Sequence, residues 1–138
     1  MRRDDEVATL REPPHSIEAE SGVLGGMLLD REAINRVPGL TADDFYRSEH
    51  KLIFTAIRQL ASAGQPCDVV TVFDRLADKA EQAGGLVYLN SLAQYVPSAS
   101  NIRRYAEIVR ERSILRKLVT ASDEIATSAF NPKGRPVS

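Results

Sequence analysis

Apolar residues recur at helical spacing along most of the chain, and turn-forming residues separate the periodic stretches. The stretch over 16–29 is predicted to be a helix because four apolar residues share one side of it: Ile17, Leu24, Met27 and Leu28. Two prolines precede it, and Ser16 stands at the expected N-cap. Glu18 and Glu20 lie at the positive end of the helix dipole. The pattern therefore predicts a helix with a well-defined start.

Glycines stand inside this first helix. Gly22 costs ~1 kcal/mol relative to alanine in a helix interior. We interpret Gly22, Gly25 and Gly26 as positions where another backbone comes close. A phosphate-binding loop is not indicated, because such a loop follows a strand and carries a lysine at a fixed place.

Further helices are predicted over about 31–37, 48–63, 68–77, 84–95 and 100–130. Their starts are expected at Asp30, at Ser48, at Asp68, at Gly84-Gly85, and at Ser100 or Asn101. A short turn over 41–44 carries Phe45 and Tyr46. The β-branched run 69–72 also fits a strand, and periodicity alone leaves that alternative open.

These elements predict an all-α fold, a compact bundle of about five short helices followed by one long C-terminal helix that begins a helical hairpin. Four segments are expected. They are a flexible arm over 1–13, a helical globular domain over 14–99, the long helix over 100–130 as the first arm of a dimerisation hairpin, and the start of the hairpin turn or linker over 131–138.

The long helix carries two apolar stripes on nearly opposite sides. The first is expected to dock on the globule and consists of Ile102, Tyr105, Ala106 and Val109. The second has the 3-4-3-4 spacing of a helix–helix seam, with Leu115, Leu118, Ser122, Ile125 and Ala129 on it and Ile108, Val119 and Ala126 beside it.

One neighbouring element cannot cover both stripes. We therefore predict a subunit or hairpin interface formed by Ile108, Leu115, Leu118, Val119, Ser122, Ile125 and Ala129. The chain ends at Ser138, before a full returning helix, so the partner is expected to be the second arm of a hairpin or another chain. The alternative is that Leu115, Leu118 and Ile125 belong to the core of the domain itself.

Composition limits the function classes. Apolar residues make up 43% and charged residues 27%, as in ordinary globular proteins, and the net charge of −1 argues against binding nucleic acid through overall charge. Cys67 is the single cysteine, so no internal disulfide is possible. No apolar run has the length of a membrane span, and the N-terminus lacks a signal peptide. Cytoplasm is the expected location, with no membrane partner.

Positive charges gather on one part of the long helix. Arg103, Arg110 and Lys117 repeat every seven residues and share one side, which makes them candidates for contact with DNA phosphates or an acidic partner. Glu107 and Glu111 interrupt this ridge and have the spacing to form ion pairs. A plain solvated, salt-bridged face is therefore the competing interpretation.

No constellation for catalysis or cofactor binding is found. His15, His50 and Cys67 match no compact zinc spacing, so no metal is expected and Cys67 is interpreted as an inert thiol. The pairs Asp4-Asp5 and Asp43-Asp44 are better explained by solvation and capping than by acid–base work. No Gly-x-x-x-x-Gly-Lys-Ser/Thr motif occurs, so this chain is expected to be no enzyme and to bind no ATP.

Ordered motifs carry a family resemblance that covers roughly residues 13–136. They are Pro13-Pro14-His15-Ser16-Ile17-Glu18-Ala19-Glu20, Val23-Leu24-Gly25-Gly26, Leu29-Asp30, Asp43-Asp44-Phe45-Tyr46, His50, Ile53-Phe54, Gly84-Gly85, Tyr88-Leu89, Pro97-Ser98-Ala99, Asn101-Ile102, Tyr105-Ala106, Ile108-Val109-Arg110-Glu111-Arg112, Phe130-Asn131-Pro132 and Gly134-Arg135. In this order they resemble the N-terminal domain of the bacterial replicative DNA helicase, the DnaB family. Ser21-Gly22 and Leu86-Val87 depart from the commoner family residues.

The resemblance implies a non-catalytic helical domain that associates as dimers, with three dimers forming a collar on a hexameric ring at the replication fork. It implies docking of primase on the collar and an influence on helicase loading, with a loader as a further partner. ATP, Mg and most DNA contacts would belong to the C-terminal domain of the parent. The rival hypothesis from the residues is an autonomous DNA-binding module that uses the basic ridge.

Overall fold

The computed structural model describes residues 12–95 and 101–131, and every regular element within them is helical. The α-helices are α2 (Ile17–Leu29), α3 (Ser48–Ser62), α4 (Val69–Leu76), α5 (Gly85–Tyr95) and α6 (Ile102–Phe130). Short 3-10 turns form η1 (Ala33–Arg36), η2 (Ala42–Asp44) and η3 (Ala77–Lys79). The predicted all-α class with a long C-terminal helix is confirmed. The predicted arm, apart from residues 12 and 13, and residues 132–138 of the predicted hairpin turn lie outside the described residues.

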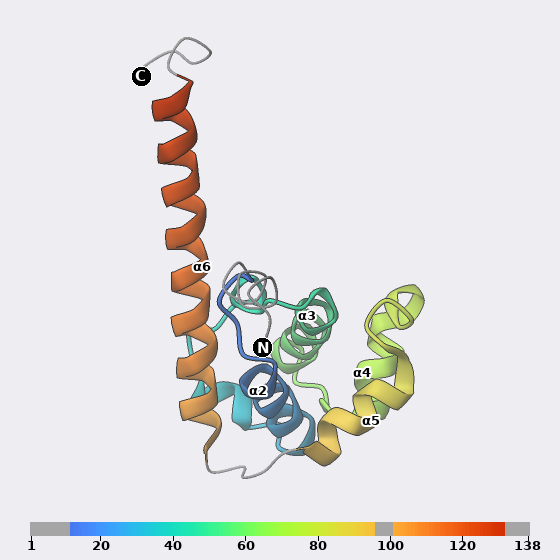
Figure 1. Ribbon diagram of the computed structural model, residues 1–138. Coiled ribbons are helices and arrows are strands. Elements are labelled where there is room, and N and C mark those ends of the chain that lie inside the picture. Colours follow the sequence, from blue (N-terminus) through green and yellow to red (C-terminus); the bar gives the residue numbers. More distant parts are fainter. Residues whose placement is uncertain (1–11, 96–100, 132–138) are drawn as a thin grey trace, which may run out of the picture.

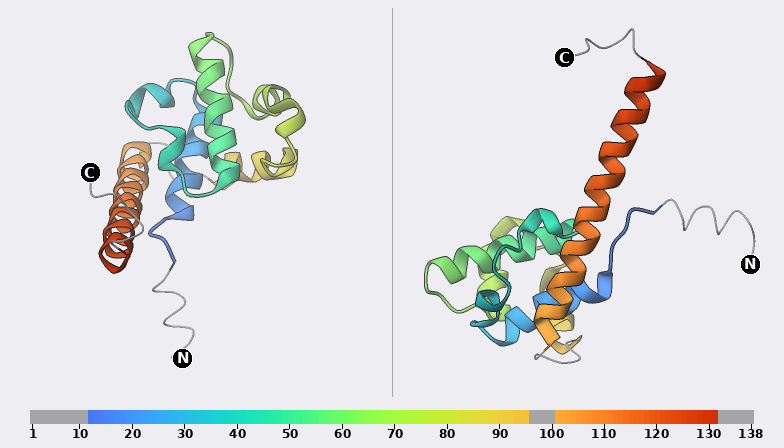
Figure 2. Two further views of the ribbon diagram at one scale, coloured as in Figure 1. Left: turned by 90° about the horizontal axis from the view of Figure 1, so that it is seen from above. Right: turned by 90° about the vertical axis from the view of Figure 1, so that its left-hand side faces the viewer.

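Helix α2 lies at the centre of the globule and packs against α3, α5 and α6, while α4 packs against α3 and α5 (Figure 1). Its residues from Ala19 to Leu28 are all buried, so it lacks a solvent-facing side over most of its length. The first part of α6 lies on this globule, and the rest runs well past it, as Figure 1 and the right-hand view of Figure 2 show. The molecule is therefore a globule with one projecting helix.

Two predicted helix starts rest on side-chain caps. The Ser16 hydroxyl accepts a hydrogen bond from the backbone N–H of Ala19 at 3.2 Å, and the Asp68 carboxylate accepts one from Thr71 at 2.8 Å. Each cap satisfies an N–H group that the first helical turn leaves free. The strand alternative for 69–72 is wrong, because these residues form the first turn of α4 behind the Asp68 cap.

Two other boundaries differ from the prediction, and one agrees with it. The expected helix over 31–37 is only the 3-10 turn η1, and it ends before Val37, where the following Pro38 disfavours helical backbone. Ser48 is the first residue of α3 and not its N-cap, since its hydroxyl donates to the Glu49 carboxylate at 3.2 Å. Asn101, one of the two predicted starts, is the N-cap residue of α6, although its side chain makes no capping bond; Ser100, the other, lies outside the described residues.

Side chains of α6 lie against Gly22 and Gly26 of α2, whereas the prediction was that another backbone comes close there. A Cβ atom at Gly22 would lie 2.7 Å from Cδ2 of Tyr105, and one at Gly26 would lie 3.0 Å from Cδ1 of Ile102. Both distances are shorter than ordinary carbon–carbon contact. Ile102, Ala106 and Val109 are buried against the core, so the first apolar stripe docks on the globule as expected.

We expect the substitution Gly22→Ala to destabilise the domain by about 1 kcal/mol, because overpacking against Tyr105 costs about 1–3 kcal/mol and outweighs the ~1 kcal/mol gained in helix propensity. Urea unfolding followed by circular dichroism measures the change. The control repeats Gly22→Ala in a Tyr105→Ala background, where the ring is absent and the same change should stabilise. The same sign in both backgrounds would contradict the packing role of Gly22.

Candidate subunit interface

The far part of α6 exposes the second apolar stripe. Leu118 and Ile125 are 61% and 71% exposed. Leu115 and Val119 are exposed to a lesser degree, and Ser122 and Ala129 are exposed as well. Ile114, which the sequence interpretation did not assign to the stripe, is 58% exposed beside them. The alternative that Leu115, Leu118 and Ile125 form intradomain core therefore does not describe this globule.

Ile108 occupies a different place from the rest of the predicted interface. It is half-buried and packs against the hydrophobic core of the globule. Ser113, a polar residue to which no role was assigned, is only 2% exposed. The docked side of α6 thus extends one turn beyond Val109, and the exposed stripe begins near Ile114.

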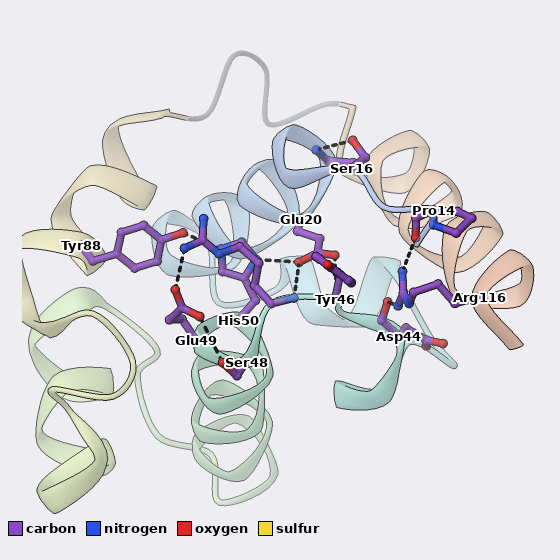
Figure 3. Close-up of polar contacts among 12 residues, drawn as sticks. Pro14, Ser16, Glu20, Asp44, Tyr46, Ser48, Glu49, His50, Tyr88 and Arg116 are labelled. Carbon is purple, nitrogen blue, oxygen red and sulfur yellow. Dashed lines mark hydrogen bonds and ion pairs between the residues drawn. The ribbon is translucent and has the colours of Figure 1, made fainter. Parts of the chain in front are cut away.

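Arg116 makes the last hydrogen bonds described between α6 and the globule. Its two terminal nitrogens donate to the carbonyl oxygen of Pro14 at 2.9 Å and to that of Asp44 at 2.7 Å (Figure 3). Pro14 precedes α2 and Asp44 ends η2, so one guanidinium joins two separate segments to α6. Charged donors make stronger hydrogen bonds to such carbonyls than neutral ones do.

An aromatic ring completes this contact. The Arg116 guanidinium carbon lies 5.6 Å from the centroid of the Tyr46 ring, within cation–π range. The His15 ring stacks on Tyr46 with centroids 4.1 Å apart and planes 10° from parallel. We call Pro14, His15, Asp44, Tyr46 and Arg116 the α6 clamp.

A buried polar network lies behind the clamp. Glu20 is 1% exposed and His50 is fully buried. One Glu20 oxygen lies 2.7 Å from Nδ1 of His50, and the other accepts the backbone N–H of Tyr46 at 2.7 Å (Figure 3). Nε2 of His50 lies 2.6 Å from the Tyr88 hydroxyl. An ionised carboxylate only accepts, so Nδ1 carries the proton toward Glu20 and Nε2 accepts from Tyr88 when the imidazole is neutral.

This network joins α2, α3 and α5 and is structural in character. Burial raises the pKa of Tyr88, so its hydroxyl keeps its proton and remains a donor at neutral pH. Nearby, the pKa of Glu49 is lowered, chiefly by its own backbone N–H and also by Arg47, whose guanidinium lies 2.6 Å away. Every fully buried side-chain N or O atom in the described residues has a hydrogen-bond partner.

The predicted basic ridge is interrupted in the structure. Arg110 donates to the carbonyl oxygen of Gly39 at 3.1 Å. Arg104 pairs with Glu107 at 3.0 Å and with Glu111 at 3.6 Å. Arg103 and Lys117 are exposed, with Arg103 on the wall of a shallow hollow beside η1. Of the three ridge residues, Arg110 is thus held by a carbonyl oxygen, whereas Arg103 and Lys117 keep exposed charges.

The other candidates for chemistry are accounted for by structure. Within residues 12–95 and 101–131, no three His, Cys, Asp or Glu side chains are grouped as metal ligands. Cys67 is buried, and burial raises the pKa of its thiol. Asp44 accepts the Thr41 N–H at 2.8 Å as a capping residue, as predicted, while Asp4-Asp5 lie outside the described part.

None of the described helices combines the length and the apolar character that a membrane span requires. The geometry defines a helical domain whose projecting helix carries an uncovered apolar stripe.

Known proteins share this domain. A model of the DnaB-like helicase N-terminal domain matches residues 12–111. The chain is 44% identical over 130 residues to the replicative DNA helicase DnaB of Geobacillus stearothermophilus and 42% identical over 128 residues to that of Pasteurella multocida. These matches cover 91% of this chain but only 28% and 27% of the relatives. The chain belongs to the DnaB-like helicase N-terminal domain family and spans little more than a quarter of the length of these relatives.

Solved structures agree with the fold. The N-terminal domain of DnaB helicase from Mycobacterium tuberculosis superposes with a TM-score of 0.86 at 38% identity, with 91% of each chain covered. A DnaB-like replicative helicase, described together with its interactions with primase, gives 0.74 at 30% identity and covers 85% of this chain and 29% of its own. The Helicobacter pylori domain, also described with primase, gives 0.71 at 24% identity, which supports the fold alone; 94% of this chain and 99% of that one are covered.

We expect Glu20→Ala to destabilise the domain by about 3 kcal/mol, because it leaves the Tyr46 N–H and the His50 imidazole buried without an acceptor. The matched control is Glu18→Ala, which removes an exposed carboxylate from the same first turn and should cost at most about 1 kcal/mol through the helix dipole. Urea unfolding measures both. Equal losses for the two variants would contradict a special role for the buried carboxylate.

Proposed function

We propose that this chain is the non-catalytic N-terminal collar domain of a hexameric replicative DNA helicase. In this role it would associate as dimers, three of which form the collar, and it would dock primase and influence helicase loading at the replication fork in the cytoplasm. The observation that carries the proposal is the exposed stripe of Leu115, Leu118 and Ile125 on the projecting part of α6.

The stripe supports self-association on energetic grounds. Fully burying an aliphatic side chain of this size is worth about 1.5–3 kcal/mol, so several at helical spacing favour a helical partner over water. The globule itself cannot supply that partner, because residues 117–127 are exposed. The occupant that fits best is an apolar helix, either the returning arm of a hairpin or a second subunit.

Primase docking is supported by family membership. A similar DnaB-like replicative helicase, 30% identical to this chain, is described with its interactions with primase. The motor would lie elsewhere in the parent, since this chain covers 27–29% of its relatives' length and contains no Gly-x-x-x-x-Gly-Lys-Ser/Thr. Bound ATP and Mg are accordingly assigned to the C-terminal domain. A helicase loader is proposed as a further partner.

The rival function, an autonomous DNA-binding module, draws less support. It depends on Arg103, Arg110 and Lys117 acting together, and Arg110 is held by Gly39. The neighbouring Arg104 is paired with two glutamates. DNA contact by this domain is therefore expected to be weak or absent.

We predict that Leu118→Asp and Ile125→Asp reduce self-association without unfolding the domain, because both side chains point into water. The effect should be clearest in a chain lengthened by ~40 residues, enough for a returning helix and a turn. Sedimentation velocity measures association, and circular dichroism measures helicity. The matched control is Thr120→Asp, which adds the same charge to an exposed position outside the stripe. Loss of helicity with unchanged association would contradict the proposed interface.

A binding experiment separates the two functions. We expect the C-terminal domain of the cognate primase to bind this chain at micromolar concentration, measured by isothermal titration. We expect fluorescence anisotropy with forked and single-stranded DNA to show no binding at physiological salt. Absence of a primase complex at tens of micromolar would count against docking. Micromolar DNA binding with a steep salt dependence would favour the DNA-binding module.

A further inference from the structure

Beyond Arg116, α6 projects past the globule, and only an open hollow separates Lys117, Thr120, Ala121 and Glu124 from Asp43 of η2. Ser113 is buried and Arg116 is partly buried, whereas all residues from Lys117 to Thr127 are exposed. The direction of this free part therefore depends on how the docked part is held. Its lever arm is long: Thr127 lies about 17 Å from Arg116 along the axis, so a rocking of about 10° displaces it by about 3 Å.

The chemistry of the α6 clamp suits it to fix that direction. Apolar contacts at Ile102, Ala106 and Val109 are not directional, and they allow a helix to rock over the surface beneath it. The two hydrogen bonds of Arg116 are directional, and they reach two carbonyl oxygens on different segments, at 2.9 and 2.7 Å. A planar guanidinium with several fixed donors can satisfy both carbonyls at once.

The surface on which Arg116 rests is itself held in place. The Tyr46 backbone N–H donates to buried Glu20 at 2.7 Å, and the Tyr46 ring is stacked by His15. The carboxylate of Asp44 accepts the N–H and hydroxyl of Thr41, which fixes the turn whose carbonyl Arg116 uses. Through Tyr46, whose backbone N–H donates to Glu20, the α6 clamp connects α6 to the buried polar network (Figure 3).

We infer that Arg116 is the positioning residue that fixes the direction in which the free part of α6 leaves the globule, by bridging the carbonyls of Pro14 and Asp44 over the Tyr46 ring. The direction of α6 depends only on contacts within this chain, whatever its function. Its consequence, that the clamp sets the angle between globules joined through the stripe, rests on the proposed self-association.

Spin-label distances in the full 138-residue chain test whether Arg116 fixes the direction of α6. Cys67, the only cysteine, is replaced by Cys67→Ala, and labels are attached through Asn90→Cys on α5 and Thr127→Cys on α6, both exposed positions. Excess unlabelled chain removes distances between molecules. We expect Arg116→Ala to broaden or shift the distance distribution by up to about 3 Å for each 10° of rocking, which is the displacement that this rotation gives at Thr127.

Three variants sharpen the result. Lys117→Ala is the matched control, because it removes the same charge from the next residue, which is exposed, and it should leave the distribution unchanged. Arg116→Lys keeps the charge but not the planar fork, so it should give an intermediate width. Tyr46→Leu removes the ring beneath the guanidinium and should broaden the distribution in a chain that retains its helicity by circular dichroism.

An unchanged distribution in both Arg116→Ala and Tyr46→Leu would overturn the inference. If Arg116→Ala fails to fold, the width for Tyr46→Leu decides alone. Sedimentation of the same variants keeps the two proposals separate. A broadened distance in this chain, together with no self-association of the unsubstituted chain lengthened by ~40 residues, supports the clamp and counts against the collar function.

Discussion

A carboxylate buried in the first turn of α2 constrains most of this domain. Glu20 is almost fully buried, and a buried charge is tolerated only when hydrogen bonds replace the water it has lost. Its oxygens take donors from Tyr46, His50 and, at 3.4 Å, Arg47. These partners lie 26–30 residues away and include the start of α3. Satisfying one side chain of α2 therefore fixes where α3 begins and holds the backbone of Tyr46 in place.

The central position of α2 explains why its sequence looks unusual. Because α2 is contacted by α3, α5 and α6, its neighbours must come close on several sides. Gly22 and Gly26 leave the room that α6 needs. The cost of glycine in a helix is offset by packing against Tyr105 and Ile102, which the docked part of α6 brings. Tyr88 of α5 closes the polar side by its contact with His50. The buried hydrogen-bond network and the close helix packing thus both depend on α2.

The sequence predicted those features that depend on residues close together in the chain, such as helix starts. The caps at Ser16 and Asp68 were recognisable because each acts within three residues of itself. Glu20 was recognised only as a favourable charge near a helix start, since its distant partners have no sequence signature. The same holds for Arg116, whose two acceptors are 102 and 72 residues away, so that no local pattern marks it. The exposed stripe was predictable because it follows from helical spacing along one segment. The partner that would cover it is not encoded in that spacing.

The two parts of α6 have different roles: the docked part contributes to folding, and the free part presents the stripe proposed for assembly. The docked part completes the core through Ile102 and Val109, so the globule does not depend on what covers Leu118 and Ile125. A free helix of about fourteen residues is marginally stable in water, yet here it propagates from a part already held by tertiary contacts, which removes the cost of nucleation. The apolar stripe can then meet a partner as a preformed surface. Less conformational entropy is lost on association than if the helix had to fold on binding.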